Sequence, residues 1–179
     1  SHVMKGYLKR PRQTKEAIKN GGFHTGDIGK FDRNKFLVIT DRKKDIIVTS
    51  GGKNVSPQNI ENSLRTDRYI SNILVCGDRK KYLTALVVPN FKNIQSYARY
   101  KRIPFKNIQG LIKETKIYDF IKRRIDKKLE CLASFERIKK FILLDRDFAQ
   151  QYGELTPTLK VKRKFINEKY KDMLNSLYE

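Results

Sequence analysis

Residues 116–131 constrain the fold of this chain more than any other stretch. Its apolar residues recur at intervals of three and four positions, with Lys and Arg between them: Ile117, Phe120, Ile121, Ile125, Leu129 and, just beyond, Leu132. That spacing places them on one face of an α-helix. Such a face is more often buried in a protein core than laid on a membrane. The segment therefore predicts a core-facing helix and a domain that packs against it.

Short apolar runs on either side of this helix predict a small sheet. The predicted strands are 36–40, 46–49, 73–76, 83–88 and 138–144, with a charged turn at 41–44 joining the first two. Further helices are predicted over 14–18, ending before Gly21 and Gly22, from Pro57 with Ser56 as N-cap, over 91–101 and over 165–177. This order of strands and helices predicts a small domain of the α+β or mixed α/β class, and we adopt α+β.

The first forty residues differ from the rest. They are rich in turns, carry one hairpin strand and offer little independent core, so we place a domain boundary near Asp41. Residues 1–41 and 42–179 are thus predicted to belong to separate domains. A polar loop carrying Pro157 is expected over 153–162.

The net charge is +21, from 40 Lys and Arg against 19 Asp and Glu. This charge suits a partner that carries phosphates, either nucleic acid, an anionic membrane surface or a phosphorylated cofactor. It equally suits a solvated Lys-rich surface. The basic residues are spread along the chain, and no strand carries the aromatic residues of an RNA-binding sheet, so nucleic acid is the disfavoured partner.

Other sequence features bear on the cellular setting. No run of 18 apolar residues occurs, so no membrane-spanning segment is predicted. Cys76 and Cys131 lie in apolar surroundings without metal-ligand spacing. Both are predicted to be buried thiols in a reducing, cytoplasmic compartment, and no metal site is expected.

Three segments carry residues that the fold alone does not require. Asp27 closes the segment FHTGD and lies in a turn predicted from Gly26 and Gly29, and a carboxylate there could accept two hydrogen bonds from a ribose diol. Arg42, in DRKKD, could hold a phosphate or ribose oxygen. Lys160, in LTPTLKVKR, could meet developing negative charge at an acyl phosphate. Taken singly, each is more simply a turn residue or a solvated cation.

The order and wording of the segments together resemble the C-terminal motifs of the acyl-adenylate-forming enzymes. That superfamily includes acyl-CoA synthetases, peptide-synthetase adenylation domains and beetle luciferases. The matching segments are MKGY (4–7), FHTGD (23–27), DRKKD (41–45), SGGKNVSP (50–57), residues 60–61 and LTPTLKVKR (155–163). The last of these, with LASFERIKKF (132–141), is similar to the long-chain fatty acid–CoA ligases in particular. Thr158–Leu159 replaces the Asn-Gly of peptide synthetases, which argues against that branch.

The resemblance implies roles in adenylation, in which a fatty acid and ATP with Mg²⁺ give an acyl adenylate and pyrophosphate. Asp27 matches the carboxylate that binds the ribose hydroxyls, and Arg42 matches an Arg that contacts ribose or phosphate. Lys160 matches the Lys that bridges the acyl carboxylate and the α-phosphate. A cation there would screen the repulsion between two anions as they approach.

The resemblance also implies a second step, in which the small C-terminal domain swings and CoA attacks the adenylate. Lys44 matches the hinge, where the family carries Asp or Lys. Gly51 and Gly52 match a loop that lines the path of the pantetheine arm, and the absence of side chains there keeps a narrow channel open. Residues 90–131 look like the helical insertion of the long-chain branch.

The resemblance implies that the chain is a C-terminal lid preceded by the tail of a large N-terminal domain. The phosphate loop, adenine motif and acyl pocket of the family are missing from it, so we expect it to be inactive without that domain. Fatty acid, ATP and CoA are its expected substrates, and peripheral membrane contact is a further expectation from its charge. Two alternatives stay open, an acyl-AMP ligase that loads a carrier protein and a basic nucleic-acid-binding module.

Overall fold

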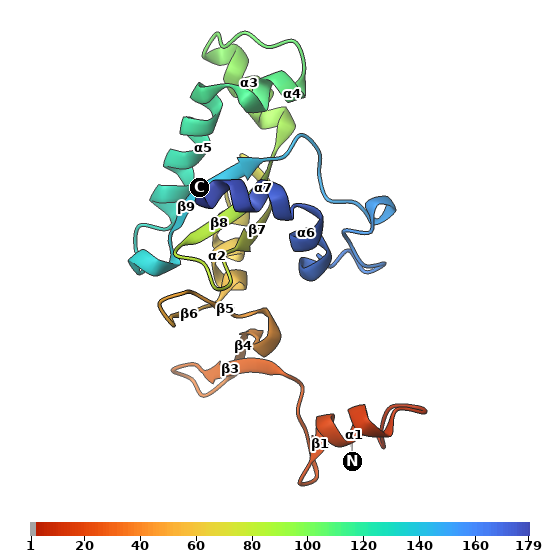
Figure 1. Ribbon diagram of the computed structural model, residues 1–179. Coiled ribbons are helices and arrows are strands. Elements are labelled where there is room, and N and C mark those ends of the chain that lie inside the picture. The colour runs from red at the N-terminus through yellow and green to blue at the C-terminus, as the bar shows by residue number, and fades with distance from the viewer. Residues whose placement is uncertain (1–2) are drawn as a thin grey trace. The chain divides into compact units, whose positions relative to one another are not determined.

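The computed structural model of the chain describes residues 3–179, and its contacts divide it into two units that meet between Ile46 and Ile47. The first unit is built from hairpins (Figure 1). Its elements are α1 (Pro11–Ala17), β1 (Ile18–Lys19), β2 (Gly22–Phe23), β3 (Asp27–Phe31), β4 (Leu37–Arg42) and the 3₁₀ turn η1 (Lys43–Asp45). β1 pairs with β2, and β3 pairs with β4, both antiparallel.

Two sequence predictions fail in this unit. Ile18, predicted to be helical, is extended and pairs with Phe23 instead. Asp27, predicted to lie in a turn, opens β3. Gly29 gave the misleading turn signal: it lies inside the strand beside a register shift, where a Cβ would come within 2.9 Å of the Leu37 side chain.

The first unit has no apolar core of its own. Among its described residues only Asp41 is buried. Both faces of the β3–β4 hairpin expose large apolar side chains, since the consecutive strand residues Leu37 and Val38 are 61% and 41% exposed. A two-stranded hairpin is marginally stable alone, so this unit needs a partner surface to hold its shape.

The second unit contains a three-stranded sheet in the order β7 (Ile70–Cys76), β8 (Leu83–Pro89), β9 (Ile138–Leu143). β7 and β8 are antiparallel, as their short connection requires, whereas β8 and β9 are parallel. The parallel pair was not predicted. Every residue of β8 is buried, as befits a strand covered on both faces.

Helices cover the two faces of this sheet, as Figure 1 shows for α5 on one side and α6 and α7 on the other. One core cluster joins Ile73, Val75 and Ala85 to the buried isoleucines of α5 (Thr115–Lys128), and also includes α2 (Pro57–Arg65) and α3 (Phe91–Tyr100). The other joins Leu74 and Leu86 to α6 (Arg163–Lys169) and α7 (Lys171–Asn175). Alternate residues of each strand thus serve opposite layers.

The segment predicted to be a helical insertion forms the crossover between β8 and β9. It contains α3, the unpredicted α4 (Ile108–Lys113) and α5. The predicted core-facing helix is confirmed, with Ile117, Ile121 and Ile125 buried. It ends at Lys128, however, so Cys131 lies beyond it and is exposed, and its predicted burial is wrong. Cys76 is buried as predicted.

The remaining elements are short. β5 (Ile47–Val48) pairs with β6 (Asn54–Val55), so the predicted hairpin between 36–40 and 46–49 does not form. The predicted C-terminal helix is divided at Tyr170 into α6 and α7 and is followed by the 3₁₀ turn η4 (Ser176–Tyr178). Two further 3₁₀ turns are η2 (Ser134–Glu136) and η3 (Gln150–Tyr152). The α+β class itself is confirmed.

None of the helices across residues 3–179 combines the length and hydropathy that crossing a bilayer demands.

Candidate functional site

Two of the predicted ribose- or phosphate-binding residues lie side by side on the β3–β4 hairpin. The strand register places Asp27 opposite Arg42, and Arg42 Nε lies 3.1 Å from Asp27 Oδ1. The Asp27 amide donates to Thr25 Oγ1 at 3.0 Å, which fixes the start of the strand. Both side chains reach solvent, Arg42 at 52% and Asp27 at 26%. The pair therefore presents an acceptor and a planar donor to any molecule that approaches this edge.

Lys44 lies in η1, the three-residue turn between β4 and β5, and is exposed. The predicted charged turn is thus displaced: Asp41 and Arg42 belong to β4, and the turn runs from Lys43 to Asp45. The division between the two units follows Ile46, two residues beyond Lys44. The linking chain is therefore short, and a change in a few dihedral angles there would reorient one unit against the other.

Gly51 and Gly52 form the tip of the β5–β6 hairpin. The Gly52 amide donates to the Thr49 carbonyl at 2.9 Å, and Gly52 adopts a left-handed conformation with φ +71°. The Lys53 amide donates to Thr49 Oγ1 at 3.1 Å. Apart from Gly52 and its two chain neighbours, none of the described residues has a heavy atom within 4 Å of the position that a Cβ at Gly52 would take. The loop thus has a fixed backbone and an open surface.

Lys160 lies on a tight hairpin between the bridged residues Leu155 and Val161. The Thr156 amide donates to the Lys160 carbonyl at 2.8 Å, and the Lys160 amide donates to Thr156 Oγ1 at 3.0 Å. Leu159 has φ +59°, a conformation that is uncommon for a residue other than glycine. The Lys160 side chain is exposed, and its amine has no hydrogen bond or ion pair to the described residues. The predicted polar loop is an ordered turn that exposes Lys160, and Lys162 is exposed on it as well.

A buried carboxylate anchors the start of this hairpin. Glu154 is fully buried, and Arg146 binds it through both terminal nitrogens at 2.7 and 2.8 Å. Lys169 Nζ lies 2.9 Å away, and the Tyr170 hydroxyl donates at 3.1 Å. Burial alone would raise the pKa of Glu154, but the hydrogen bonds from Arg146 and Lys169 outweigh it and lower that pKa to about 2. Glu154 is therefore held as an anion.

A second buried ion pair anchors the other end of the hairpin. Both carboxylate oxygens of Glu61 on α2 accept hydrogen bonds from Arg163 Nη2 at 2.9 Å, and Arg163 Nη1 donates to the Val75 carbonyl. Burial raises the pKa of Glu61 in spite of this partner. The residues that flank Lys160 are thereby attached to the sheet and to α2 at fixed points.

The anchoring residues were missed by sequence reasoning. Glu61 and Arg163 both lie in segments that carry the family resemblance, but 102 positions separate them and nothing local pairs them. Glu154 directly precedes LTPTLKVKR, so its position beside the motif was the one available signal. The Gly51–Gly52 loop and the Lys160 hairpin share no hydrogen bond with one another.

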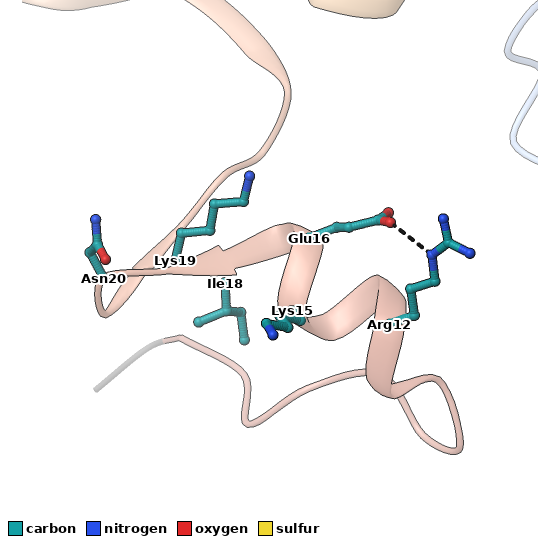
Figure 2. A pocket seen from close by; sticks show the side chains of 6 residues that line it. All are labelled: Arg12, Lys15, Glu16, Ile18, Lys19 and Asn20. Carbon is teal, nitrogen blue, oxygen red and sulfur yellow. Dashed lines mark hydrogen bonds and ion pairs between the residues drawn. The ribbon is translucent and has the colours of Figure 1, made fainter.

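An open hollow of about 560 Å³ lies against α1 and is lined by Arg12, Lys15, Glu16, Ile18, Lys19 and Asn20. Figure 2 shows Arg12 and Glu16 joined by an ion pair at its rim. None of the residues of α1 is buried, so the walls have no packed support.

Within residues 3–179, no group of three His, Cys, Asp or Glu side chains could hold a metal ion. Neither feature adds to the site.

Solved structures of similar fold are adenylate-forming enzymes. The A domain of a carboxylic acid reductase from Segniliparus rugosus, in complex with AMP and a co-purified carboxylic acid, is 26% identical with a TM-score of 0.80. The match covers 98% of this chain and 26% of that one. An o-succinylbenzoate CoA synthetase of Bacillus subtilis, in complex with its acyl-adenylate intermediate, is 25% identical with a TM-score of 0.63 over 90% of this chain and 28% of that one.

Sequence comparison narrows this class to one family. The AMP-binding enzyme C-terminal domain matches residues 44–179, and the chain belongs to that family. A long-chain-fatty-acid–CoA ligase of Mycobacterium tuberculosis is 37% identical over 177 residues, which are 98% of this chain and 30% of the relative. A mouse ligase of the same description is 34% identical over 99% of this chain and 29% of its own length. The chain thus spans about 30% of the length of these relatives.

Proposed function

We propose that this chain is the C-terminal part of an AMP-forming long-chain fatty acid–CoA ligase and acts together with a large N-terminal domain. The observation that carries the proposal is the 37% identity to such a ligase over 98% of the chain, including the Lys160 hairpin. The exposed apolar side chains of the β3–β4 hairpin support it, because they require a covering surface. Without the large domain we expect no catalysis.

In the first half-reaction, a fatty acid carboxylate oxygen attacks the α-phosphorus of ATP and pyrophosphate leaves. Lys160 binds the carboxylate and the α-phosphate together and reduces the repulsion between them. Its free amine and its doubly anchored hairpin suit this role. Asp27 and Arg42 bind the ribose hydroxyls and a ribose or phosphate oxygen, respectively. Mg²⁺ accompanies ATP and is held mainly with the large domain.

In the second half-reaction, the CoA thiol attacks the acyl carbonyl, loses its proton, and AMP leaves. The unit that begins at Ile47 turns about Lys44, removes Lys160 from the adenylate and brings up Gly51 and Gly52. The open space at Gly52 supports passage of the thin pantetheine arm. We propose that the enzyme is cytoplasmic and that the net charge of +21 on this chain also permits peripheral contact with anionic membranes.

The test is ATP–pyrophosphate exchange with palmitate, measured for this chain alone and for the chain joined to its large domain. We expect exchange only in the joined protein, followed by thioester formation when CoA is added. Exchange by the isolated chain would contradict the proposed division of the site. A folded, joined protein that exchanges nothing with any fatty acid would overturn the proposal as a whole.

One observation favours an alternative in which the acyl acceptor is not CoA. The A-PCP didomain of the same carboxylic acid reductase matches 98% of this chain with a TM-score of 0.77. The alternative is therefore an acyl-AMP ligase that loads a carrier protein. Supplying the joined protein with CoA and with a carrier protein in parallel separates the two, because only the true acceptor will be acylated efficiently.

A further inference from the structure

The connection between β7 and β8 is a tight basic turn at residues 77–82. Gly77 has φ +141°, and a Cβ there would lie 3.0 Å from the Tyr82 carbonyl. Arg79 has φ +57°, a left-handed conformation that Gly or Asn adopts more readily. An arginine held in this conformation at an exposed turn is a reason to look for a role of its side chain.

This turn is attached to the Gly51–Gly52 hairpin. The Arg79 amide donates to the Val48 carbonyl at 2.8 Å, and the Ser50 amide donates to the Lys80 carbonyl at 3.0 Å. The Val48 amide donates to Asp78 Oδ1 at 3.1 Å. Three hydrogen bonds thus hold the two loops side by side. A molecule that lies along Gly51 and Gly52 therefore also lies close to this turn.

The two loops carry excess positive charge. Residues 48–54 and 77–82 contain four basic residues and one acidic residue, Asp78. Lys80 is committed elsewhere, since its Nζ donates to Asn175 and lies over the Tyr178 ring. Arg79 is 92% exposed, and its 3.9 Å ion pair with Asp78 is weak. Arg79, Lys81 and Lys53 are therefore exposed cations around the hairpin.

We propose that Arg79 and Lys81 bind phosphate groups of the CoA nucleotide while the pantetheine arm passes Gly51 and Gly52. This inference rests on the proposed function, which supplies CoA as the acceptor. CoA carries a diphosphate and a 3′-phosphate at the end remote from its thiol, and a guanidinium binds phosphate through two parallel hydrogen bonds. The turn would hold the anionic end and leave the thiol free to reach the adenylate.

The test uses Arg79→Asn combined with Lys81→Gln in the joined protein. Asn suits the left-handed backbone at 79, so the thermal midpoint should not fall. We expect the KM for CoA to rise about tenfold, kcat to change less than twofold, and ATP–pyrophosphate exchange to stay constant. The KM for pantetheine, which lacks the phosphates, should be unchanged. Arg123→Gln combined with Lys127→Gln, which removes two exposed charges from α5, is the matched control.

Three results would overturn the inference. The first is an unchanged KM for CoA while exchange is intact. The second is an equal rise in the KM for pantetheine, which would indicate a general distortion of the channel. The third is a rise in the KM for CoA no larger than that of the α5 control, which would show that the effect comes from net charge alone. Loss of exchange in the unaltered joined protein would instead remove the proposed function, and this inference with it.

Discussion

The two units of this chain each carry a prominent carboxylate–arginine pair, and the pairs differ in burial and in the number of their contacts. In the first unit, Asp27 and Arg42 form one ion pair on a hairpin without a core, and both reach solvent. In the second, Glu154 is fully buried and receives two bonds from Arg146 and one from Lys169. An exposed pair contributes little to stability, whereas breaking a buried one is costly.

The difference separates residues that can exchange partners from residues that must keep them. Asp27 and Arg42 can turn from one another to a ribose or phosphate at small cost, because water already screens them. Glu154 cannot release Arg146 without losing two of the hydrogen bonds that stabilise its buried charge. The second unit therefore uses its ion pairs to fix a hairpin on which Lys160 is a free charge.

The largest effect is expected when that free charge is removed. Lys160→Ala in the joined protein should lower ATP–pyrophosphate exchange about 100- to 1,000-fold, the range seen when one group that stabilises developing charge is lost. Thioester formation from preformed acyl adenylate should be nearly unchanged, because that step is proposed to proceed with Lys160 withdrawn.

Lys162→Ala is the matched control for this experiment. Lys162 is exposed on the same hairpin, and its backbone amide donates to the Glu154 carbonyl at 2.8 Å. It should retain exchange within a few fold. If Lys160→Ala impairs both half-reactions equally, the assigned role is wrong and the residue is structural.

The next largest effect concerns the buried anchor. Glu154→Gln keeps the shape of the side chain but leaves Arg146 and Lys169 without their anion, so we expect a loss of about 2–3 kcal/mol in the free energy of unfolding. The value lies below that of a wholly buried pair because both cations are about one-third exposed. Urea denaturation of the chain measures it, with the exposed Glu168→Gln on α6 as control.

The same carboxylate sets a pH dependence with a definite sign. The pKa of Glu154 is about 2 in the folded chain against a usual 4.5, so its stabilisation is fully present above pH 4.5. It is lost as the pH falls towards 2, by about 3 kcal/mol in total. The free energy of unfolding should therefore fall less steeply in Glu154→Gln than in the wild type over this interval. Parallel curves would show that Glu154 is not held as an anion.

Sequence reasoning succeeded where the controlling interactions are local. The helical face of Ile117, Ile121 and Ile125 and the Ser56 cap of α2 follow from spacing and side-chain chemistry within one or two turns. The strands β7 and β8 likewise follow from short apolar runs. Their α+β combination was predicted correctly for the same reason.

Sequence reasoning failed where the interacting partner lies far away in the sequence. Gly29 gives a turn signal, yet it lies in β3 and pairs with β4, where the Leu37 side chain occupies the space that a Cβ would need. The anchors of the Lys160 hairpin come from Glu61 on α2 and Arg146 before η3, which no local pattern links to it. The roles of Asp27, Arg42, Lys44, Gly51, Gly52 and Lys160 come from the family resemblance and stay predictions.

A smaller effect is expected at the junction of the two units. Lys44→Pro fixes φ and restricts Lys43, which should hinder the swing between half-reactions. We expect the thioester-forming step to slow about tenfold or more, with exchange largely retained. Lys44→Ala removes the charge but leaves the backbone free, so it should preserve both steps. Equal rates for Lys44→Pro and the wild type in the CoA step would place the hinge elsewhere.

The smallest effect on stability is expected in the exposed pair of the first unit. Asp27→Asn should change the free energy of unfolding by less than about 0.5 kcal/mol, because Arg42 remains solvated. The KM for ATP in exchange should nevertheless rise about tenfold, since a neutral amide accepts weaker hydrogen bonds from ribose hydroxyls than a carboxylate does. Asp126→Asn breaks an exposed ion pair on α5 and should alter neither quantity. A loss of stability comparable to that of Glu154→Gln, with an unchanged KM for ATP, would show that Asp27 is an anchor and not a ligand-binding residue.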